Sequence, residues 1–259
     1  MKTKKIPSNW KLSKIILLFK KGSKNDIKNY RPISLMVTVA KIFSSMIEFR
    51  LRGLLSHNQS PCQAGFRKGF STTNHLHVIN QLIQKTTEYN INLHLAFIDF
   101  TKAFDLLNQN FMFQALINQG VNQDLVKIIQ EMYKGLKAQI ILDTEGPQFE
   151  IRRGVRQGDP LSPLLFNCAL DEIFKNLSWE EMGLEINGEK INNLRFADDV
   201  VLVAESAEQL QIMLDDLNTE SKKAGMEINL SKTKILSNET NKKEIKIDKT
   251  PLELSLIHI

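Results

Sequence analysis

Cysteine and histidine are scarce in this sequence, and their spacing excludes several kinds of site. The 259 residues contain two cysteines, Cys62 and Cys168, which are far apart and form no Cys-x-x-Cys pair. Neither a disulfide scaffold nor a cysteine zinc site is therefore expected. The five histidines include no His-Glu-x-x-His pattern, which excludes the zinc hydrolases that carry that motif.

Long hydrophobic runs are also absent. The longest near the start, Ile15–Phe19, has five residues, whereas a membrane span needs about 18 or more. The basic N-terminus lacks the apolar core and cleavage site of a signal peptide. Since 42% of the residues are hydrophobic, the chain can bury a substantial core, and we expect a soluble intracellular protein without a membrane partner.

Acidic residues are rare in the first part of the chain. Residues 1–100 contain 16 Lys and Arg against 4 Asp and Glu, a balance of +12, whereas residues 101–259 contain 18 against 25, a balance of −7. A basic segment followed by an acidic one is typical of a protein that binds a polyanion at one end and gathers carboxylates at the other. A solvated basic surface would produce the same asymmetry.

The hydrophobic pattern alternates between helical and extended segments and predicts an α+β fold. Expected helices lie at residues 37–55, 72–87, 109–119, 124–134, 161–177 and 206–224. Expected strands lie at residues 94–98, 138–142, 148–152, 194–197, 200–204 and 226–230. Asn187-Gly188 indicates a hairpin. No pattern is evident beyond about residue 237.

Aspartates carry the clearest chemical signal. Asp99 ends a short apolar strand, and Asp198 and Asp199 form the turn of an apolar hairpin. If these strands are neighbours in one sheet, the carboxylates converge at one edge, where two of them about 4 Å apart repel by roughly 4 kcal/mol. Hard cations such as Mg²⁺ would offset that repulsion, and two such ions can catalyse phosphoryl transfer. Taken alone, an Asp-Asp pair such as Asp198-Asp199 is usually ordinary turn chemistry, because aspartate tolerates turn backbones.

Six short motifs follow one another along residues 29–237. They read Asn-Tyr-Arg-Pro-Ile-Ser-Leu (29–35), Gln-Ala-Gly-Phe-Arg (63–67), Phe-Ile-Asp-Phe-Thr-Lys-Ala-Phe-Asp (97–105), Arg-Gly-Val-Arg-Gln-Gly-Asp-Pro-Leu-Ser-Pro (153–163), Phe-Ala-Asp-Asp (196–199) and Gly-Met-Glu-Ile-Asn (225–229) with Lys232-Thr233. In order and spacing they resemble two finger motifs and motifs A, B, C and D of the reverse transcriptases of non-LTR (LINE-type) retrotransposons.

This resemblance implies roles for particular residues. Asp99, Asp198 and Asp199 match the catalytic metal ligands, together with the backbone carbonyl of Phe100. The residues that match nucleotide-binding positions are Arg67, Phe104, Gln157, Gly158 and Lys232. Arg67 and Lys232 correspond to triphosphate contacts, with Lys234 as a competitor of Lys232. Phe104 corresponds to a gate that excludes the ribose 2′-hydroxyl.

Other matched residues have less direct roles. Gln157 and Gly158 correspond to the lining of the nucleotide and template. Arg31 matches a template contact, although a structural role is equally open. Asp105 and Asp159 are interpreted as structural hydrogen-bonding residues.

The implied fold is a right-hand polymerase with an antiparallel palm sheet backed by helices. We expect fingers over residues 1–92, a palm over 93–238, and a truncated tail or the start of a thumb over 239–259, where 254–259 resembles the end of an incomplete reading frame. The endonuclease and Cys/His-rich segment usual in the family have no match here.

The implied activity is RNA-directed DNA polymerisation by a retrotransposon fragment. It would use two Mg²⁺ ions, with Mn²⁺ as a substitute, an RNA template, a DNA primer and dNTPs, in the cytoplasm and in the nucleus at the target DNA. Two alternatives stay open at this point. One is a group II intron-type reverse transcriptase with a maturase role, and the other is a non-catalytic nucleic-acid-binding remnant.

Overall fold

The chain folds into two compact units, each built from two separate stretches of sequence. The computed structural model describes residues 5–55, 59–239 and 243–256. The first unit comprises residues 1–58 and 104–169, and the second comprises residues 59–103 and 170–259. Helix α6 (Ser162–Lys175) begins in the first unit and ends in the second. The division into fingers over 1–92 and palm over 93–238 therefore stays a prediction.

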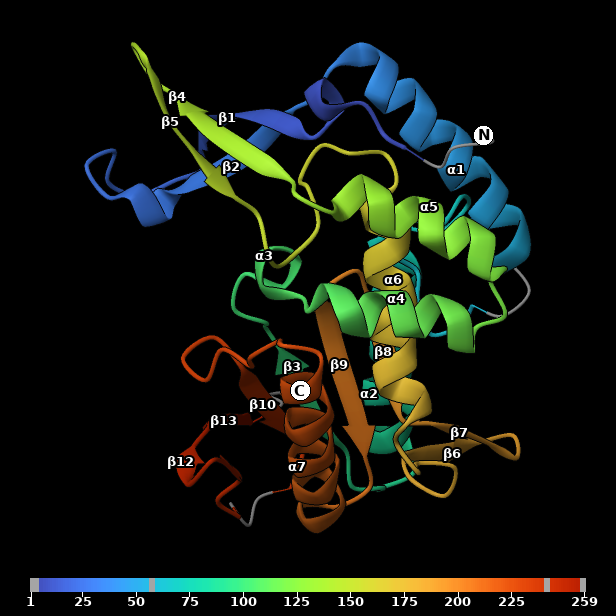
Figure 1. Ribbon diagram of the computed structural model, residues 1–259. Helices are drawn as coiled ribbons and strands as arrows, with labels where there is room; N and C mark the ends of the chain where they lie inside the picture. Colours follow the sequence, from blue (N-terminus) through green and yellow to red (C-terminus); the bar gives the residue numbers. More distant parts are fainter. Residues whose placement is uncertain (1–4, 56–58, 240–242, 257–259) are drawn as a thin grey trace. The chain divides into compact units, whose positions relative to one another are not determined.

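A four-stranded mixed sheet organises the first unit (Figure 1). Its order is β2 (Tyr30–Leu35), β1 (Leu12–Phe19), β4 (Lys137–Ile141) and β5 (Glu145–Glu150). Strands β1 and β4 are parallel, and the other neighbouring pairs are antiparallel.

Further helices lie in the first unit besides the start of α6. They are α1 (Thr38–Leu55), α3 (Ala103–Leu106), α4 (Gln109–Asn118) and α5 (Gln123–Tyr133), with short 3-10 turns at Ser8–Trp10 and Ile27–Asn29. Asn108 and Asn122 are the N-cap residues of α4 and α5. Each side chain accepts a hydrogen bond from a backbone N–H of the first turn.

A five-stranded sheet organises the second unit. Its order is β13 (Glu253–Leu256), β10 (Lys234–Ser237), β3 (His94–Ile98), β9 (Asp199–Ala204) and β8 (Asn193–Phe196). All neighbours are antiparallel except β10 and β13. Two small hairpins, β6 (Leu184–Ile186) with β7 (Glu189–Ile191) and β11 (Lys246–Ile247) with β12 (Thr250–Pro251), complete the unit.

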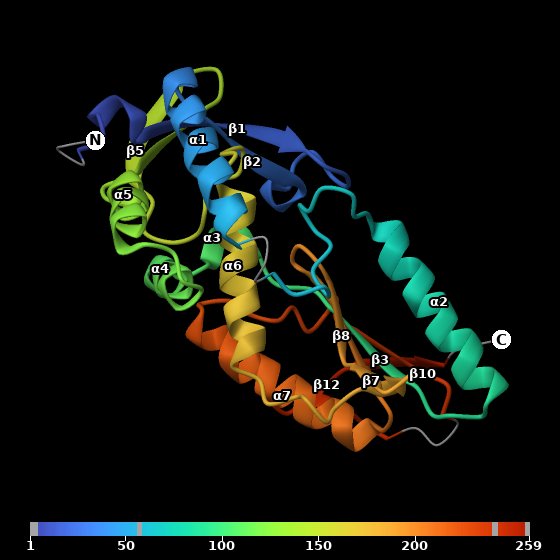
Figure 2. The ribbon, with the colours of Figure 1, turned by 90° about the vertical axis from the view of Figure 1, so that its right-hand side faces the viewer.

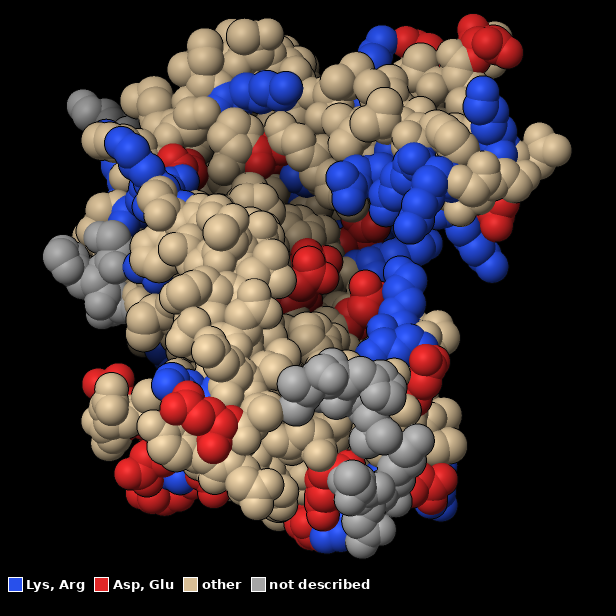
Figure 3. Space-filling model, turned by 180° about the vertical axis from the view of Figure 1, so that it is seen from behind, with Lys and Arg blue, Asp and Glu red and all other residues tan. Residues whose placement is uncertain are grey.

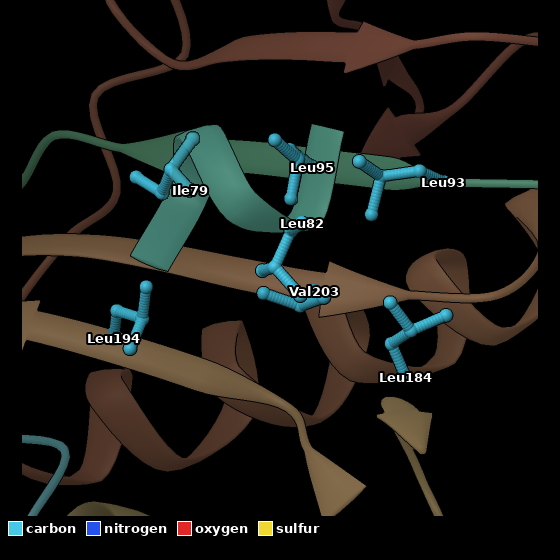
Figure 4. Close-up of a cluster of buried hydrophobic side chains, with 7 residues drawn as sticks. All are labelled: Ile79, Leu82, Leu93, Leu95, Leu184, Leu194 and Val203. Carbon is cyan, nitrogen blue, oxygen red and sulfur yellow. The ribbon is translucent and has the colours of Figure 1, made fainter. Parts of the chain in front are cut away.

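Two helices cover opposite faces of the five-stranded sheet (Figure 2). Helix α7 (Ala207–Lys223) packs on β3 and β9, and helix α2 (Thr72–Glu88) packs on the other face. Because side chains alternate along a strand, β3 and β9 present residues to both helices. Figure 4 shows the cluster on the α2 side, which consists of Ile79, Leu82, Leu93, Leu95, Leu184, Leu194 and Val203.

The helices follow the sequence-based expectation closely, whereas several strands do not. The strand expected at residues 226–230 is wrong, because a turn at Asn229 interrupts it: its carbonyl accepts the N–H groups of Lys232 and Thr233. Within the expected strand, Ile228 forms an isolated antiparallel bridge with Phe100. Strands β1 and β2 were not anticipated within the lysine-rich start, nor β11, β12 and β13 within the stretch without evident pattern.

Residues 257–259 lie outside the described part of the chain, but Leu254 and Ser255 pair with β10 in the sheet. Among the described residues, no helix combines the length and the apolar character that crossing a bilayer requires.

Leu82→Ala should destabilise the second unit, because Leu82 is 1% exposed at the centre of the α2 cluster. Truncating a buried leucine costs about 2–5 kcal/mol. Leu76→Ala is the matched control, since Leu76 lies on the same helix with 57% of its surface exposed, and it should change stability by less than about 0.5 kcal/mol. Urea unfolding measures both, and equal effects would contradict the packing of α2 on the sheet.

Candidate active site

Two adjacent strands bring the motif aspartates to one end of the five-stranded sheet. The last register pair of β3 and β9 joins Ile98 to Val200. The next residues are Asp99, directly after β3, and Asp199, the first residue of β9. Asp198 lies in the turn that precedes β9. The convergence expected from the sequence is therefore present.

The turn between β8 and β9 has two residues, Ala197 and Asp198, because Phe196 pairs with Asp199. Such short turns need a positive φ at a central position, which glycine adopts most readily. Here Ala197 has φ of 57°. A non-glycine residue in this region costs about 1–2 kcal/mol, so the surrounding structure has to stabilise the turn.

The electrostatics of the turn show that negative charges gather there. The pKa of Asp199 is raised above its ordinary value, first by partial burial and then by the negative charges of Asp198 and Asp99. One carboxylate oxygen of Asp99, Oδ2, is buried and accepts no hydrogen bond within the described residues. The gathered negative charge favours a bound cation, because a cation would neutralise the repulsion.

The segment after Asn229 brings a positive charge close to Asp99. The ammonium of Lys232 lies 3.4 Å from Asp99 Oδ2, and the Asp99 N–H donates to the Thr233 hydroxyl at 3.4 Å. Lys234, its sequence-based competitor, lies in β10 and forms an ion pair with Glu253 of β13. The geometry favours Lys232 as the lysine of this site.

The site offers oxygen ligands but not a complete cage. No group of three or more Asp, Glu, His or Cys side chains in the described part of the chain is arranged to hold a metal by itself. Mg²⁺ typically binds through one or two carboxylates and keeps water or substrate phosphate oxygens in its other positions. The aspartates therefore fit a divalent-metal site whose remaining ligands come from outside the chain.

Phe100 is a buried residue next to Asp99. The bridge to Ile228 uses the Asp99 carbonyl, which accepts from Asn229 N–H at 2.7 Å, and the Thr101 N–H, which donates to Glu227 at 2.8 Å. Neither bond uses the carbonyl of Phe100 itself, the atom that the sequence comparison implicates in metal binding.

The Arg67 side chain forms hydrogen bonds within its own loop. Its Nη1 donates to the carbonyls of Ser60 at 2.9 Å and Gln63 at 3.1 Å, and its guanidinium lies 4.5 Å from the ring centroid of Phe70. These contacts fix the orientation of the side chain. The role of Arg67 in triphosphate binding stays a prediction.

The remaining candidate residues belong to the first unit. Gln157 donates from its side chain to Asp105 at 2.8 Å, and its carbonyl accepts the Ser34 N–H at 2.8 Å. Gly158 has φ of 109°, and a Cβ there would lie 2.9 Å from the Ser34 carbonyl oxygen. This glycine is thus required by close packing within the protein. Arg31 lies in β2 with an exposed side chain.

Phe104 stacks on Phe166, with ring centroids 4.3 Å apart and planes 13° from parallel. Asp105 and Asp159 make structural hydrogen bonds, as expected. Asp159 is buried and accepts from Arg156 at 2.7 Å and from Leu161 N–H at 3.1 Å.

Sequence reasoning missed two features beside the turn. Arg195 of β8 forms a buried ion pair with Asp171 of α6 at 2.8 Å, and its guanidinium lies 4.3 Å from the Phe174 ring centroid. Gln63 bonds directly to the backbone of Ala197. The signal for Gln63 was its place in a recognised motif, but nothing in the sequence indicated its partner.

Asp199→Asn should raise the midpoint of thermal unfolding at pH 7. Because the folded-state pKa of Asp199 is raised, its ionised form destabilises the folded protein at neutral pH. The gain should shrink as the pH falls and disappear about one unit below the ordinary Asp pKa of 3.8, where the carboxyl binds a proton in both states. Asp215→Asn on the exposed side of α7 is the control and should change little. A lower midpoint of Asp199→Asn at pH 7 would contradict the repulsion between Asp199 and the neighbouring carboxylates.

Comparison with known proteins agrees with this geometry. Residues 20–247 match the family model described as reverse transcriptase (RNA-dependent DNA polymerase). The R2 retrotransposon Pol polyprotein of Nasonia vitripennis is 30% identical over 93% of this chain, and that of the R2DM element of Drosophila melanogaster is 28% identical over 88%. The chain spans 23% and 21% of the lengths of these two relatives.

Solved structures of telomerase share the fold. Apo telomerase of Candida tropicalis truncated from its C-terminal domain superposes with a TM-score of 0.68 at 16% identity, covering 92% of this chain and 52% of that one. Telomerase of Candida albicans with a fragment of telomeric RNA gives 0.66 at 15% identity, covering 96% and 46%.

The right-hand polymerase fold of the α+β class is thus confirmed. The retrotransposon relatives also favour a reverse transcriptase of the non-LTR retrotransposon type over one of the group II intron type. Members of the matched family generally use divalent metal ions. The chain belongs to the reverse transcriptase (RNA-dependent DNA polymerase) family.

Proposed function

We propose that this chain extends the 3′-hydroxyl of a DNA primer along an RNA template, adding deoxynucleotides and releasing pyrophosphate. The observation that carries the proposal is the gathering of carboxylates at the paired ends of β3 and β9. Asp99, Asp198, Asp199 and the Phe100 carbonyl are its metal ligands for two Mg²⁺ ions, with Mn²⁺ as an alternative.

Bound metal would activate the primer hydroxyl and neutralise charge on the triphosphate. The residues of the chain have supporting roles in this proposal. Lys232 and Arg67 contact the triphosphate, since an ammonium and a guanidinium both suit phosphate oxygens. Gln157 and Gly158 line the nucleotide and template, and Phe104 excludes the ribose 2′-hydroxyl.

The first unit supplies positive charge for nucleic acid. Lys20, Lys21, Lys24 and Lys28 are exposed in the connection between β1 and β2, and Arg31 is exposed in β2. Figure 3 shows Lys and Arg side chains gathered over the four-stranded sheet. Phosphate contacts of this kind support template binding that weakens as salt rises.

The biological setting is proposed from the relatives. Because they are retrotransposon polyproteins more than four times as long as the matched segment, we propose that this segment is the polymerase part of such an element. It would act inside the cell, in the cytoplasm and, at the target DNA, in the nucleus.

Asp198→Asn should abolish primer extension. The assay supplies purified protein with oligo(dT)-primed poly(rA), dTTP and Mg²⁺, and removing a metal ligand should lower the rate by at least about a hundredfold. Asp215→Asn, with its side chain exposed on α7, is the matched control and should extend the primer at the wild-type rate.

Chelation of the metal by EDTA should stop the reaction, and Mn²⁺ should restore it. If wild-type protein binds the template but extends no primer, the non-catalytic remnant is the better description. Retained activity in Asp198→Asn would refute the assignment of the metal ligands.

Phe104→Val should increase the incorporation of ribonucleotides. A smaller side chain would leave room for a 2′-hydroxyl, so the ratio of kcat/KM for UTP to that for dTTP should rise by about tenfold or more. Phe166→Leu is the comparison, because Phe166 is the stacking partner of Phe104. If both variants lose stability and neither changes the ratio, Phe104 is an ordinary packing residue.

A further inference from the structure

We propose that Gln63 and Gly65 are positioning residues that hold the Ala197-Asp198 turn in its catalytic conformation. This inference rests on the proposed function, because the turn matters for catalysis only if its aspartates bind the metal. The two residues belong to the same unit as Asp99, Asp198 and Asp199.

The side chain of Gln63 bonds to the turn residue from both sides. Its Oε1 accepts the Ala197 N–H at 2.9 Å, and its Nε2 donates to the Ala197 carbonyl at 3.3 Å. The same Oε1 accepts the Gly65 N–H at 2.8 Å. Gln63 is fully buried, so the Ala197 N–H and carbonyl would lose their direct partners in the protein interior if the side chain were removed.

Backbone bonds place the Gln63 segment against β8. Arg195 N–H donates to the Cys62 carbonyl at 2.8 Å, and Ala64 N–H donates to the Arg195 carbonyl at 2.8 Å. Gln63 and Arg195 thus form a parallel bridge next to the catalytic hairpin. The segment therefore extends the edge of the sheet and fixes the position of the glutamine relative to the turn.

Gly65 allows this contact because it has no side chain. A Cβ at this position would lie 2.1 Å from the Ala197 nitrogen and 2.8 Å from its Cα. Those are backbone atoms of the turn, so any larger residue would have to displace the turn or the segment. The close approach and the hydrogen bonds of Gln63 thus act on the same residue.

The turn needs such support because Ala197 has a positive φ. Without Gln63, the buried N–H of Ala197 loses its acceptor, and other turn conformations compete with the observed one. The carboxylates of Asp198 and Asp199 follow Ala197 in the chain, so their positions change with it. Displacing a catalytic group by about 1 Å can lower the rate by roughly a hundredfold.

The segment also contacts the arginine proposed to bind triphosphate. Arg67 Nη1 donates to the Gln63 carbonyl. One glutamine therefore bonds through its side chain to the turn of the aspartates and through its backbone to Arg67.

The experiment compares Gln63→Met with Gln209→Met in the full chain. Methionine has nearly the volume of glutamine but makes no comparable hydrogen bonds. Gln209 is a matched control, because its Oε1 also accepts two backbone N–H groups, those of Gly183 at 3.2 Å and Glu205 at 3.1 Å, away from the turn. Three quantities are measured: amide hydrogen exchange by peptide, Mn²⁺ affinity, and kcat and KM for primer extension.

Gln63→Met should speed amide exchange in the peptide containing Ala197, weaken Mn²⁺ binding by about tenfold, and lower kcat by about ten- to a hundredfold with little change in KM for template–primer. Gln209→Met should speed exchange near Gly183 and Glu205 and leave Mn²⁺ binding and kcat unchanged. Gly65→Ala should reproduce the effects of Gln63→Met with the glutamine present. Gly53→Ala should not, because a Cβ there would meet no atom of the described residues within 4 Å outside its own stretch of helix.

The proposal is overturned if Gln63→Met loses stability yet keeps Mn²⁺ affinity and kcat, since Gln63 would then be only a packing residue. It is also overturned if exchange at Ala197 is unchanged. Should wild-type protein extend no primer, the proposed function fails, but exchange at Ala197 and Mn²⁺ affinity still decide whether Gln63 holds the turn.

Discussion

Like charges gather at the end of β3 and β9, and the pairing of these two strands is the constraint on which the site depends. Asp99 comes directly after Ile98 and Asp199 directly before Val200, and Ile98 pairs with Val200. The backbone register alone therefore brings the two aspartates together. The register is secured by buried side chains on both faces, such as Leu95 and Val203 towards α2. A slip of one residue would turn these side chains to the wrong faces, so packing energy opposes the carboxylate repulsion.

The hairpin that carries Asp198 is stabilised from two further directions. On one side, Arg195 of β8 pairs with Asp171 of α6 in a buried ion pair. Burial raises the pKa of Asp171, whereas the positive charge of Arg195 lowers it, so the pair is stable only while both partners remain. On the other side, the segment at Gln63 bonds to the backbone of the same strand and turn. Such contacts specify one conformation for a turn that contains a strained alanine.

The sequence was sufficient for the helices and for the aspartates, because both have strong local signals. Amphipathic periodicity and residues such as Ser71 and Ser206 define where α2 and α7 begin. Strands β1 and β2 were missed because apolar residues such as Ile16, Leu18 and Leu35 occupy exposed positions, so the sequence does not alternate between apolar and polar residues. The strand expected at 226–230 failed because Asn229 forms a turn, and turn bonds depend on neighbours that a hydrophobic pattern does not reveal.

Motif positions also combine chemical and architectural requirements that only coordinates separate. Gly158 matches a position that lines the nucleotide, yet its lack of a side chain is already required by the Ser34 carbonyl within the protein. Gln157 likewise has its amide directed by Asp105 before any substrate binds. Gln63 shows the reverse case, since a residue with no assigned chemistry bonds to the catalytic turn. A motif therefore identifies which residues matter, and the partners of each side chain determine whether it contacts substrate or shapes the residues that do.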